Sequence, residues 1–246
     1  MKKTLTICMV ALLTCSSFAG AKRMMTKMKA EILAQRAIVE SVYGLKIKFS
    51  ETVTNIIDAS FKGDVASKTG KRHINGIIIE ESVYDEDRDI AKVTASVKIG
   101  TIEELDEDFK ERFKDKVIRR VAFATSTIEQ LPKLLAMRAA EIDAYKNLLK
   151  IITGFTLESE TTIENFMIKS DVVKTSVIGA LMGAEVSDYR WEGKDNDAVV
   201  KVRINIKEFE EMLPERIKNL DKEYIEATGY GAGVNDYKTS KEQTQK

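Results

Sequence analysis

Side chains that commonly carry catalysis or bind metals are scarce in this sequence. Its 246 residues include one histidine, His73, and two cysteines, Cys8 and Cys15, both close to the N-terminus. One histidine excludes a multi-histidine metal site and His-centred catalysis with a second histidine as base. His73 follows Lys71 and Arg72, and this polar run favours a solvated loop position.

The sequence also lacks an excess of charge of either sign, because 39 basic residues balance 39 acidic ones. Nucleic-acid binding usually requires a concentrated basic face, so this balance offers no electrostatic basis for it. Only two prolines and a hydrophobic content of 43% fit a folded chain that buries a core. No apolar run approaches the ~20 residues of a membrane span. We therefore expect membrane contact to be peripheral at most.

Residues 1–21 are predicted to be an export signal peptide. Two lysines at positions 2–3 precede an apolar run at 5–13, which is the order found in secretory signals. Small residues then offer cleavage sites after Ala19 and after Ala21. Cleavage at either site would place the mature chain in the periplasm.

The two cysteines allow two interpretations of this segment. Cleavage after residue 19 or 21 removes both, so the mature chain has no disulfide and no thiolate chemistry. The alternative is a lipoprotein, with Leu12-Leu13-Thr14-Cys15 as the attachment box and Cys15 as the lipidated residue. Threonine before the cysteine departs from the Gly, Ala or Ser that this box prefers.

Two stretches of the chain resemble each other. Ala30-Glu31-Ile32 reappears as Ala140-Glu141-Ile142, at an offset of 110 in the numbering, and Gly44 and Gly154 follow at the same offset. After a three-residue slip the match continues at an offset of 107, where Val93, Ala95, Val97 and Ile99 correspond to Val200, Val202, Ile204 and Ile206. A duplicated module without duplicated catalytic residues typically serves assembly or binding.

We predict an α+β fold made of two tandem copies, over residues 22–125 and 126–228. In each copy a helix ends at a glycine and packs on one face of a small antiparallel sheet. The predicted helices run from about Met24 to Tyr43 and, with a Ser126–Glu129 capping box, from about Leu131 to Ile152.

Alternating apolar residues predict the strands. Those of the first copy are 45–49, 77–84 and 92–99, and those of the second are 155–159, 184–191 and 200–207, with polar hairpin turns at 85–89 and 193–197.

Short acidic helices are expected at 102–105 and 209–212. Residues 117–124 are predicted to form an extra strand without a counterpart after Leu220. Met167–Met182 suits either a helix or a strand, and 229–246 is predicted to be a disordered tail.

Three aspartates imitate the start of a calcium-binding loop. Asp85, Asp87 and Asp89 have the spacing of its first three ligands. A complete loop also needs glycine at its sixth position and glutamate at its twelfth, where this chain has Ile90 and Ser96. A hairpin turn is therefore the favoured interpretation.

Two other motifs have simple structural explanations. Gly229, Gly231 and Gly233 imitate a phosphate-binding loop but lack the expected flanking strand and helix, which favours a flexible tail. The pairs Glu103-Glu104 and Glu210-Glu211 favour solvated helix faces.

One pair of aromatic residues stands at equivalent positions in the two copies. Tyr84 and Trp191 correspond at the offset of 107, each near the end of a predicted hairpin strand. They are either core anchors or exposed contact residues. Burial in the core is favoured because aromatic side chains bury large areas.

The second copy carries a family-like pattern. Residues 137–149, MRAAEIDAYKNLL, are followed by Gly154, by Glu160-Thr161-Thr162-Ile163-Glu164 and by Ser170-Asp171-Val172. This pattern resembles the LPP-twenty lipoprotein family, which includes the flagellar protein FlgP, and is similar to the N-terminal domain of the flagellar protein FlgT. The resemblance covers about residues 131–208.

The resemblance implies an envelope protein on the periplasmic side of the outer membrane. FlgP-like proteins form disks or rings around the flagellar motor, and the family supplies no catalytic residues. The tandem duplication and the Thr14-Cys15 box depart from the family's usual single-copy lipoproteins.

We therefore expect a non-enzymatic structural protein that associates with itself and with flagellar or outer-membrane proteins. No cofactor, metal or catalytic residue is expected. The alternative is a monomeric periplasmic binding module that recognises cell wall, a small ligand or another envelope protein at a concave site. A hydrolase, the third class, would need paired carboxylates in a cleft.

Overall fold

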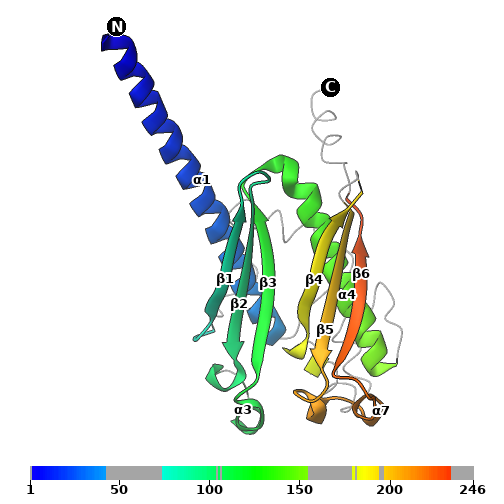
Figure 1. The fold of residues 1–246 in the computed structure, drawn as a ribbon. Helices are drawn as coiled ribbons and strands as arrows, with labels where there is room; N and C mark the ends of the chain where they lie inside the picture. Colours follow the sequence, from blue (N-terminus) through cyan, green and yellow to red (C-terminus); the bar gives the residue numbers. More distant parts are fainter. Residues whose placement is uncertain are drawn as a thin grey trace, which may run out of the picture.

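The computed structural model describes residues 2–42, 74–103, 105, 107–154, 179–180, 182–193 and 197–233. Over these ranges the chain is mixed helix and strand, with four helices and two three-stranded antiparallel sheets (Figure 1). The elements are α1 (Lys2–Val42), β1 (Ile78–Asp85), β2 (Ile90–Lys98), η1 (Ile99–Thr101), α3 (Glu107–Phe113), β3 (Val117–Thr125), η2 (Ile128–Gln130), α4 (Leu131–Thr153), β4 (Glu185–Glu192), β5 (Asp197–Asn205), η3 (Glu210–Met212), α7 (Glu215–Lys218) and β6 (Tyr224–Gly231). We call α1 with β1–β3 the first half and α4 with β4–β6 the second half.

Helix α4 confirms the predicted helix of the second half. Its apolar stripe is buried, Pro132 lies in its first turn, and Gly154 ends it in the left-handed conformation at φ 78°. The predicted capping box is wrong, because no side chain caps η2 or α4. The Ser126 hydroxyl instead shares a 2.8 Å hydrogen bond with the Thr26 hydroxyl of α1.

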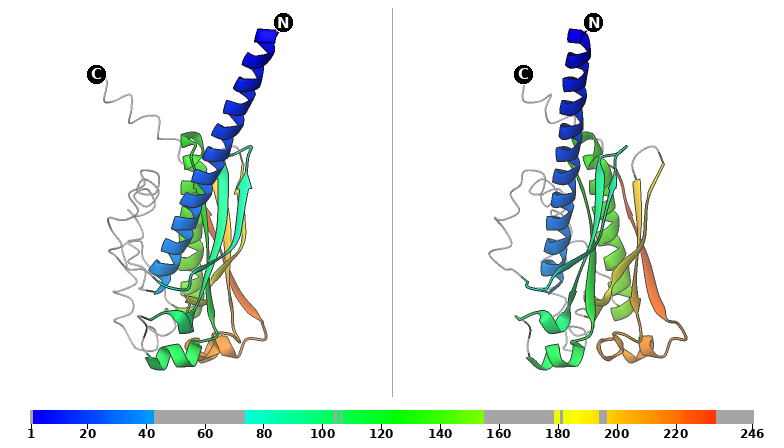
Figure 2. Two further views of the ribbon diagram at one scale, coloured as in Figure 1. Left: turned by 90° about the vertical axis from the view of Figure 1, so that its left-hand side faces the viewer. Right: turned by 60° about the vertical axis from the view of Figure 1, so that its left-hand side comes forward.

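Helix α1 is longer than predicted at its N-terminal end. It has 41 residues and includes 2–21, the predicted export signal, which projects beyond the sheets (Figures 1 and 2). Further along, Ala30, Ala34 and Ile38 are fully buried against β2 and β3. Among the described residues, no helix combines the length and apolar character needed to cross a membrane.

Both predicted hairpins are confirmed, and their registers correspond. In the first half Ile79 pairs with Ala95 and Glu81 with Thr94, with a bulge between the pairs. In the second half Val186 pairs with Val202 and Asp188 with Lys201, again with a bulge between them, each residue at the offset of 107. The predicted inward faces of β2 and β5 are the buried ones.

The third strands of the two sheets also correspond, which corrects the sequence-based prediction. Strand β3 was expected to lack a counterpart, but β6 pairs with β5 as β3 pairs with β2. Ala91 opposes Ala124 in one sheet, and at the same offset of 107 Ala198 opposes Gly231 in the other.

The predicted tail is also wrong at its start, because Gly229–Gly231 form the end of β6. Residues 234–246 lie outside the described ranges. The glycines of β6 have a packing role. A Cβ atom at Gly229 would collide with the main chain of Ala140 and Ala144, and one at Gly231 with that of Ala136. Glycine inside a strand often marks such a close backbone approach.

Smaller elements also differ from prediction. Ile102 and Glu103 are not helical, and the short helix of the first half is α3 instead. The acidic segment at 209–212 contains the short η3 helix. The predicted strands at 45–49 and 155–159 lie outside the described residues. So does most of Met167–Met182, of which residues 179–180 and 182 are helical.

Each helix covers one face of its own sheet (Figure 2). The opposite faces carry ion pairs such as Arg119–Glu80 and Arg203–Glu185. The buried apolar side chains of both halves nevertheless form one continuous cluster. The halves therefore share a core while keeping separate sheets.

The close approach of α4 to β6 gives a first prediction. Replacing Gly229 with alanine should destabilise the fold by about 1–3 kcal/mol, because the new methyl group requires α4 and β6 to separate. In an unobstructed strand alanine would instead stabilise by about 0.5–1 kcal/mol through the unfolded state. Urea unfolding distinguishes these signs. Glu226→Ala, on the exposed face of the same strand, is the matched control.

Candidate functional site

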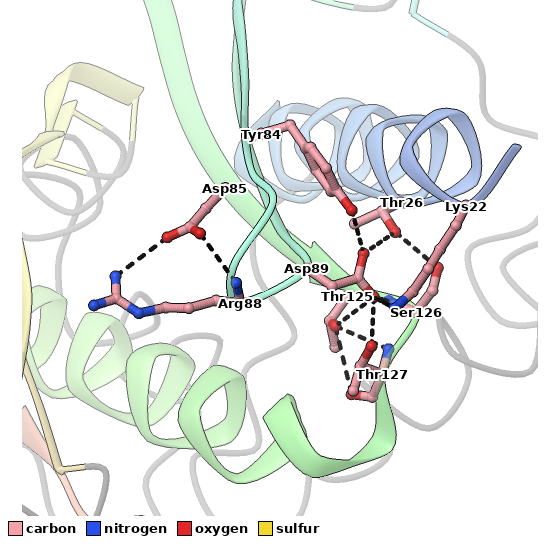
Figure 3. Close-up of polar contacts among 9 residues, drawn as sticks. All are labelled: Lys22, Thr26, Tyr84, Asp85, Arg88, Asp89, Thr125, Ser126 and Thr127. Atoms are coloured by element: carbon pink, nitrogen blue, oxygen red, sulfur yellow. Dashed lines mark hydrogen bonds and ion pairs between the residues drawn. The ribbon is translucent and has the colours of Figure 1, made fainter. Parts of the chain in front are cut away.

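The three aspartates of the β1–β2 turn do not converge on a common point. Asp85 accepts hydrogen bonds from the main-chain N–H and the guanidinium of Arg88, at 3.0 and 3.2 Å (Figure 3). Asp87 is exposed, whereas Asp89 is only 4% exposed and points to other partners. Over the described ranges, no three His, Cys, Asp or Glu residues gather in a way that could hold a metal ion. The turn is thus a hairpin turn, as favoured from the sequence.

Asp89 instead joins three elements of the first half. Its carboxylate accepts hydrogen bonds from the hydroxyls of Thr26 at 2.8 Å and Thr127 at 2.6 Å, and from Tyr84 at 3.0 Å. Lys22 of α1 makes an ion pair with it at 3.3 Å (Figure 3). We call these five residues the Asp89 cluster. It fixes α1 to the β1–β2 turn and to the segment after β3.

The partners of Asp89 determine its charge state. Burial raises the pKa of this carboxyl, but the hydrogen bonds from Thr127, Thr26, Tyr84 and Lys22 together hold the pKa below its ordinary value. Burial, followed by the hydrogen bond to Asp89, raises the pKa of Tyr84 to about 12. Asp89 is therefore ionised and Tyr84 neutral at physiological pH. A carboxylate so fully engaged by donors is suited to holding structure together.

Asp89 also has an unusual backbone conformation, with φ at 51°. Aspartate and asparagine tolerate this left-handed region better than most residues. Aspartate therefore suits position 89 in two ways: its carboxylate accepts the hydrogen bonds of the cluster, and its backbone tolerates the positive φ of the turn.

An aromatic cluster lies where the two halves meet. The ring of Phe123 on β3 contacts Tyr189 and Trp191 on β4, at centroid distances of 4.8 and 6.0 Å, both edge to face. The Trp191 indole donates a hydrogen bond of 3.0 Å to the Lys133 carbonyl of α4. Tyr84 and Trp191 are both partly buried against the core. Trp191 thus packs against the core and also contacts the first half through Phe123.

Arg120 on β3 is a second link between the halves, and sequence reasoning missed it. The side chain is only 5% exposed. Its Nε donates to the Ser41 hydroxyl at 2.6 Å, and its Nη1 donates to the Ala184 carbonyl of the second half at 2.8 Å. The guanidinium also lies 5.8 Å from the centre of the Tyr145 ring on α4. One signal was available, because Arg120 shares the buried phase of its strand with Ile118.

A small cavity lies between α1, β3 and α4. Its volume is about 60 Å³, and its walls are mainly apolar, including Leu33, Phe123, Leu134 and Met137, with the Arg138–Glu141 ion pair of 2.7 Å beside them. The cavity could hold roughly two water molecules, and it is well below the ~150 Å³ of a cavity that binds benzene.

The remaining candidate residues from the sequence analysis do not lie at the contact between the two halves. His73 and Glu104 lie outside the described residues, and Glu103 is exposed in a turn. Glu210 and Glu211 are exposed on η3, where Glu211 pairs with Arg112 of α3 at 2.7 Å. Cys15 lies in α1, within the predicted export signal.

Comparison of the chain with protein-family models, curated proteins and solved structures found no match.

The Asp89 cluster predicts a defined response to pH. Because the folded pKa of Asp89 is lowered, its contribution to stability is present above the unfolded value of ~3.9 and is lost as pH falls through the folded value. Asp89→Asn should cost about 2 kcal/mol at pH 7 and should reduce the loss of stability below about pH 5. Urea unfolding from pH 7 to pH 3 measures both effects. Equal acid sensitivity in variant and wild type would contradict the assignment, and Asp87→Asn in the same turn is the control.

The buried arginine predicts a second stability difference. Arg120→Ala should destabilise the chain by about 2–4 kcal/mol, since it leaves a cavity and removes the donors to Ser41 and Ala184. Arg119→Ala, which removes an exposed ion pair from the neighbouring position, should cost only about 0–1 kcal/mol. Chemical denaturation compares them directly. Similar losses from both substitutions would show that Arg120 is not a link between the halves.

Proposed function

We propose that this chain is an exported, non-enzymatic structural protein of the bacterial envelope. In this proposal it self-assembles into a ring or disk associated with the flagellar motor, and its two halves are tandem copies of one module. Several observations support the duplication. The β-pairings, including the bulges, recur at the offset of 107. Fully buried Ala30 and Ala34 also match the fully buried Ala140 and Ala144 at the offset of 110.

One observation carries the assembly proposal: the two halves meet through unlike edges. Strand β3 of the first half lies beside β4 of the second (Figure 1), while β1 and β6 are the outer strands of the two sheets as far as the described residues extend. Outer strands with unpaired N–H and C=O groups can pair with another chain. Among copies of a module, a contact between unlike edges can be repeated, which builds closed rings or open filaments.

The location rests on sequence features. The predicted signal peptide at 1–21 supports export, with lipidation at Cys15 as the alternative anchor. The flagellar association and the position near the outer membrane rest on the resemblance of residues 131–208 to the LPP-twenty, FlgP-like pattern. Self-association and partners among flagellar or outer-membrane proteins follow from that resemblance.

The alternative is a monomeric periplasmic binding module. The cavity between α1, β3 and α4 is the feature that favours it, because it lies between the two halves. Its volume of about 60 Å³ restricts a small-molecule ligand to a few heavy atoms unless the walls move. Assembly is therefore the better supported function.

Self-assembly gives a direct test. The purified chain, with its N-terminus determined by intact mass, should form high-order oligomers at tens of micromolar, as measured by light scattering and sedimentation velocity. A deletion strain should lose motility if the assembly belongs to the flagellar motor. A monomer at every concentration, or one whose melting temperature rises only with a cell-wall fragment, would favour the binding module instead.

A further inference from the structure

Two exposed apolar surfaces lie at opposite ends of the pair of sheets. On β6, Tyr230 is 67% exposed. On α1, Met24 is 64% exposed, and Met28 is exposed one turn further along the same face. Single exposed apolar residues are common on proteins, so what matters is where these residues lie and not their exposure alone.

The positions of these residues repeat those that join the two halves. At the offset of 107, Tyr230 corresponds to Phe123, which packs on Trp191 and Tyr189 of the neighbouring sheet. Tyr84 on β1 corresponds to Trp191 at the same offset. The surface of β6 thus presents an aromatic ring where β3 presents one to β4, and β1 presents the corresponding receiving position.

Exposed residues of α1 likewise correspond to residues of α4 that lie at the contact between the halves. Leu134 on α4 is 5% exposed and lines the cavity with Leu33 of α1 and Phe123 of β3. At the offset of 110, Met24 corresponds to Leu134, and Met28 corresponds to Arg138, another residue of that cavity wall. Among the described residues nothing covers Met24 and Met28, which are 64% and 49% exposed. Their exposure is therefore what an unfilled copy of the internal contact would show.

We infer that Tyr230 of one chain docks onto Met24, Met28 and Tyr84 of a second copy of this chain. This inference rests on the proposed self-assembly and identifies the surfaces that carry it. The two surfaces are different, so each chain offers one of each, and addition proceeds head to tail.

The contact between chains lacks two parts of the internal contact. Tyr189, the ring nearest to Phe123 in the internal contact at 4.8 Å, corresponds at the offset of 107 to Ser82. Residue 227, which corresponds to Arg120 at the offset of 107, is alanine. The buried guanidinium that reaches the Ala184 carbonyl therefore has no equivalent between chains. Assembly should be reversible and dependent on concentration, while the two halves within a chain stay together.

Complementary variants test this docking. Tyr230→Lys introduces a positive charge opposite two cations of the proposed receiving surface. These are Arg23, which lies 5.7 Å from the centre of the Tyr84 ring, and Lys27, which donates to the Ser82 carbonyl at 3.1 Å. The double variant Met24→Glu, Met28→Glu blocks the opposite surface. Each variant alone should associate at least tenfold more weakly than wild type in sedimentation velocity. Leu220→Glu, which changes an exposed apolar residue elsewhere, should assemble as wild type does.

Mixing the two blocked variants gives the decisive result. Each retains one intact surface, so an equimolar mixture should form a complex of two chains and stop there. Circular dichroism and urea midpoints equal to wild type confirm that both variants fold. Wild-type assembly that persists in both variants, or a mixture that stays monomeric, overturns the docking while leaving self-assembly intact. A monomeric wild type overturns self-assembly itself, and the docking with it.

Discussion

The fold depends on how closely a helix can approach a strand. On α4, Ala136, Ala140 and Ala144 face the glycines of β6, and the main chains are so near that no Cβ fits between them. Dispersion forces fall steeply with distance, so this approach increases the number of favourable contacts per residue. It also explains why small side chains are concentrated on these two elements. In the first half, Ala122 and Ala124 occupy the positions of Gly229 and Gly231 on the strand beneath α1.

The two halves share their sheet register but not their buried polar contacts. The Asp89 cluster and Arg120 have no equivalents in the described part of the second half. Position 136 is alanine where α1 has Thr26, and position 227 is alanine where β3 has Arg120. Thr26 holds α1 to the β1–β2 turn, whereas Arg120 reaches across to α4 and the Ala184 carbonyl. Similar frameworks thus carry different polar links, one within the first half and one between the halves.

Regular patterns made part of this fold predictable from the sequence. The apolar stripe of α4, the stop at Gly154 and the alternation in β2 and β5 each depend on neighbours along the chain, and each was confirmed. The end of strand β6 was missed because glycines on their own indicate a flexible segment. Their role is visible only in the fold, where the absence of a Cβ lets the strand approach the main chain of α4. Asp89 was considered as a calcium ligand because its true partners, Lys22, Thr26 and Thr127, come from distant segments. Arg120 was missed for the same reason.

The 41-residue length of α1 has a consequence for the proposed export of this chain. Lys22, the first residue after the predicted cleavage site at Ala21, already contacts buried Asp89. A cut at that bond would make Lys22 the new amino terminus, with an α-ammonium group added beside its side-chain charge. The positive end of the shortened helix would then lie next to an anion that the fold already buries. Trimming past Thr26 would remove two of the carboxylate's partners, Lys22 and Thr26. The proposed cleavage and the polar contacts that hold α1 to its sheet therefore involve the same short stretch of chain.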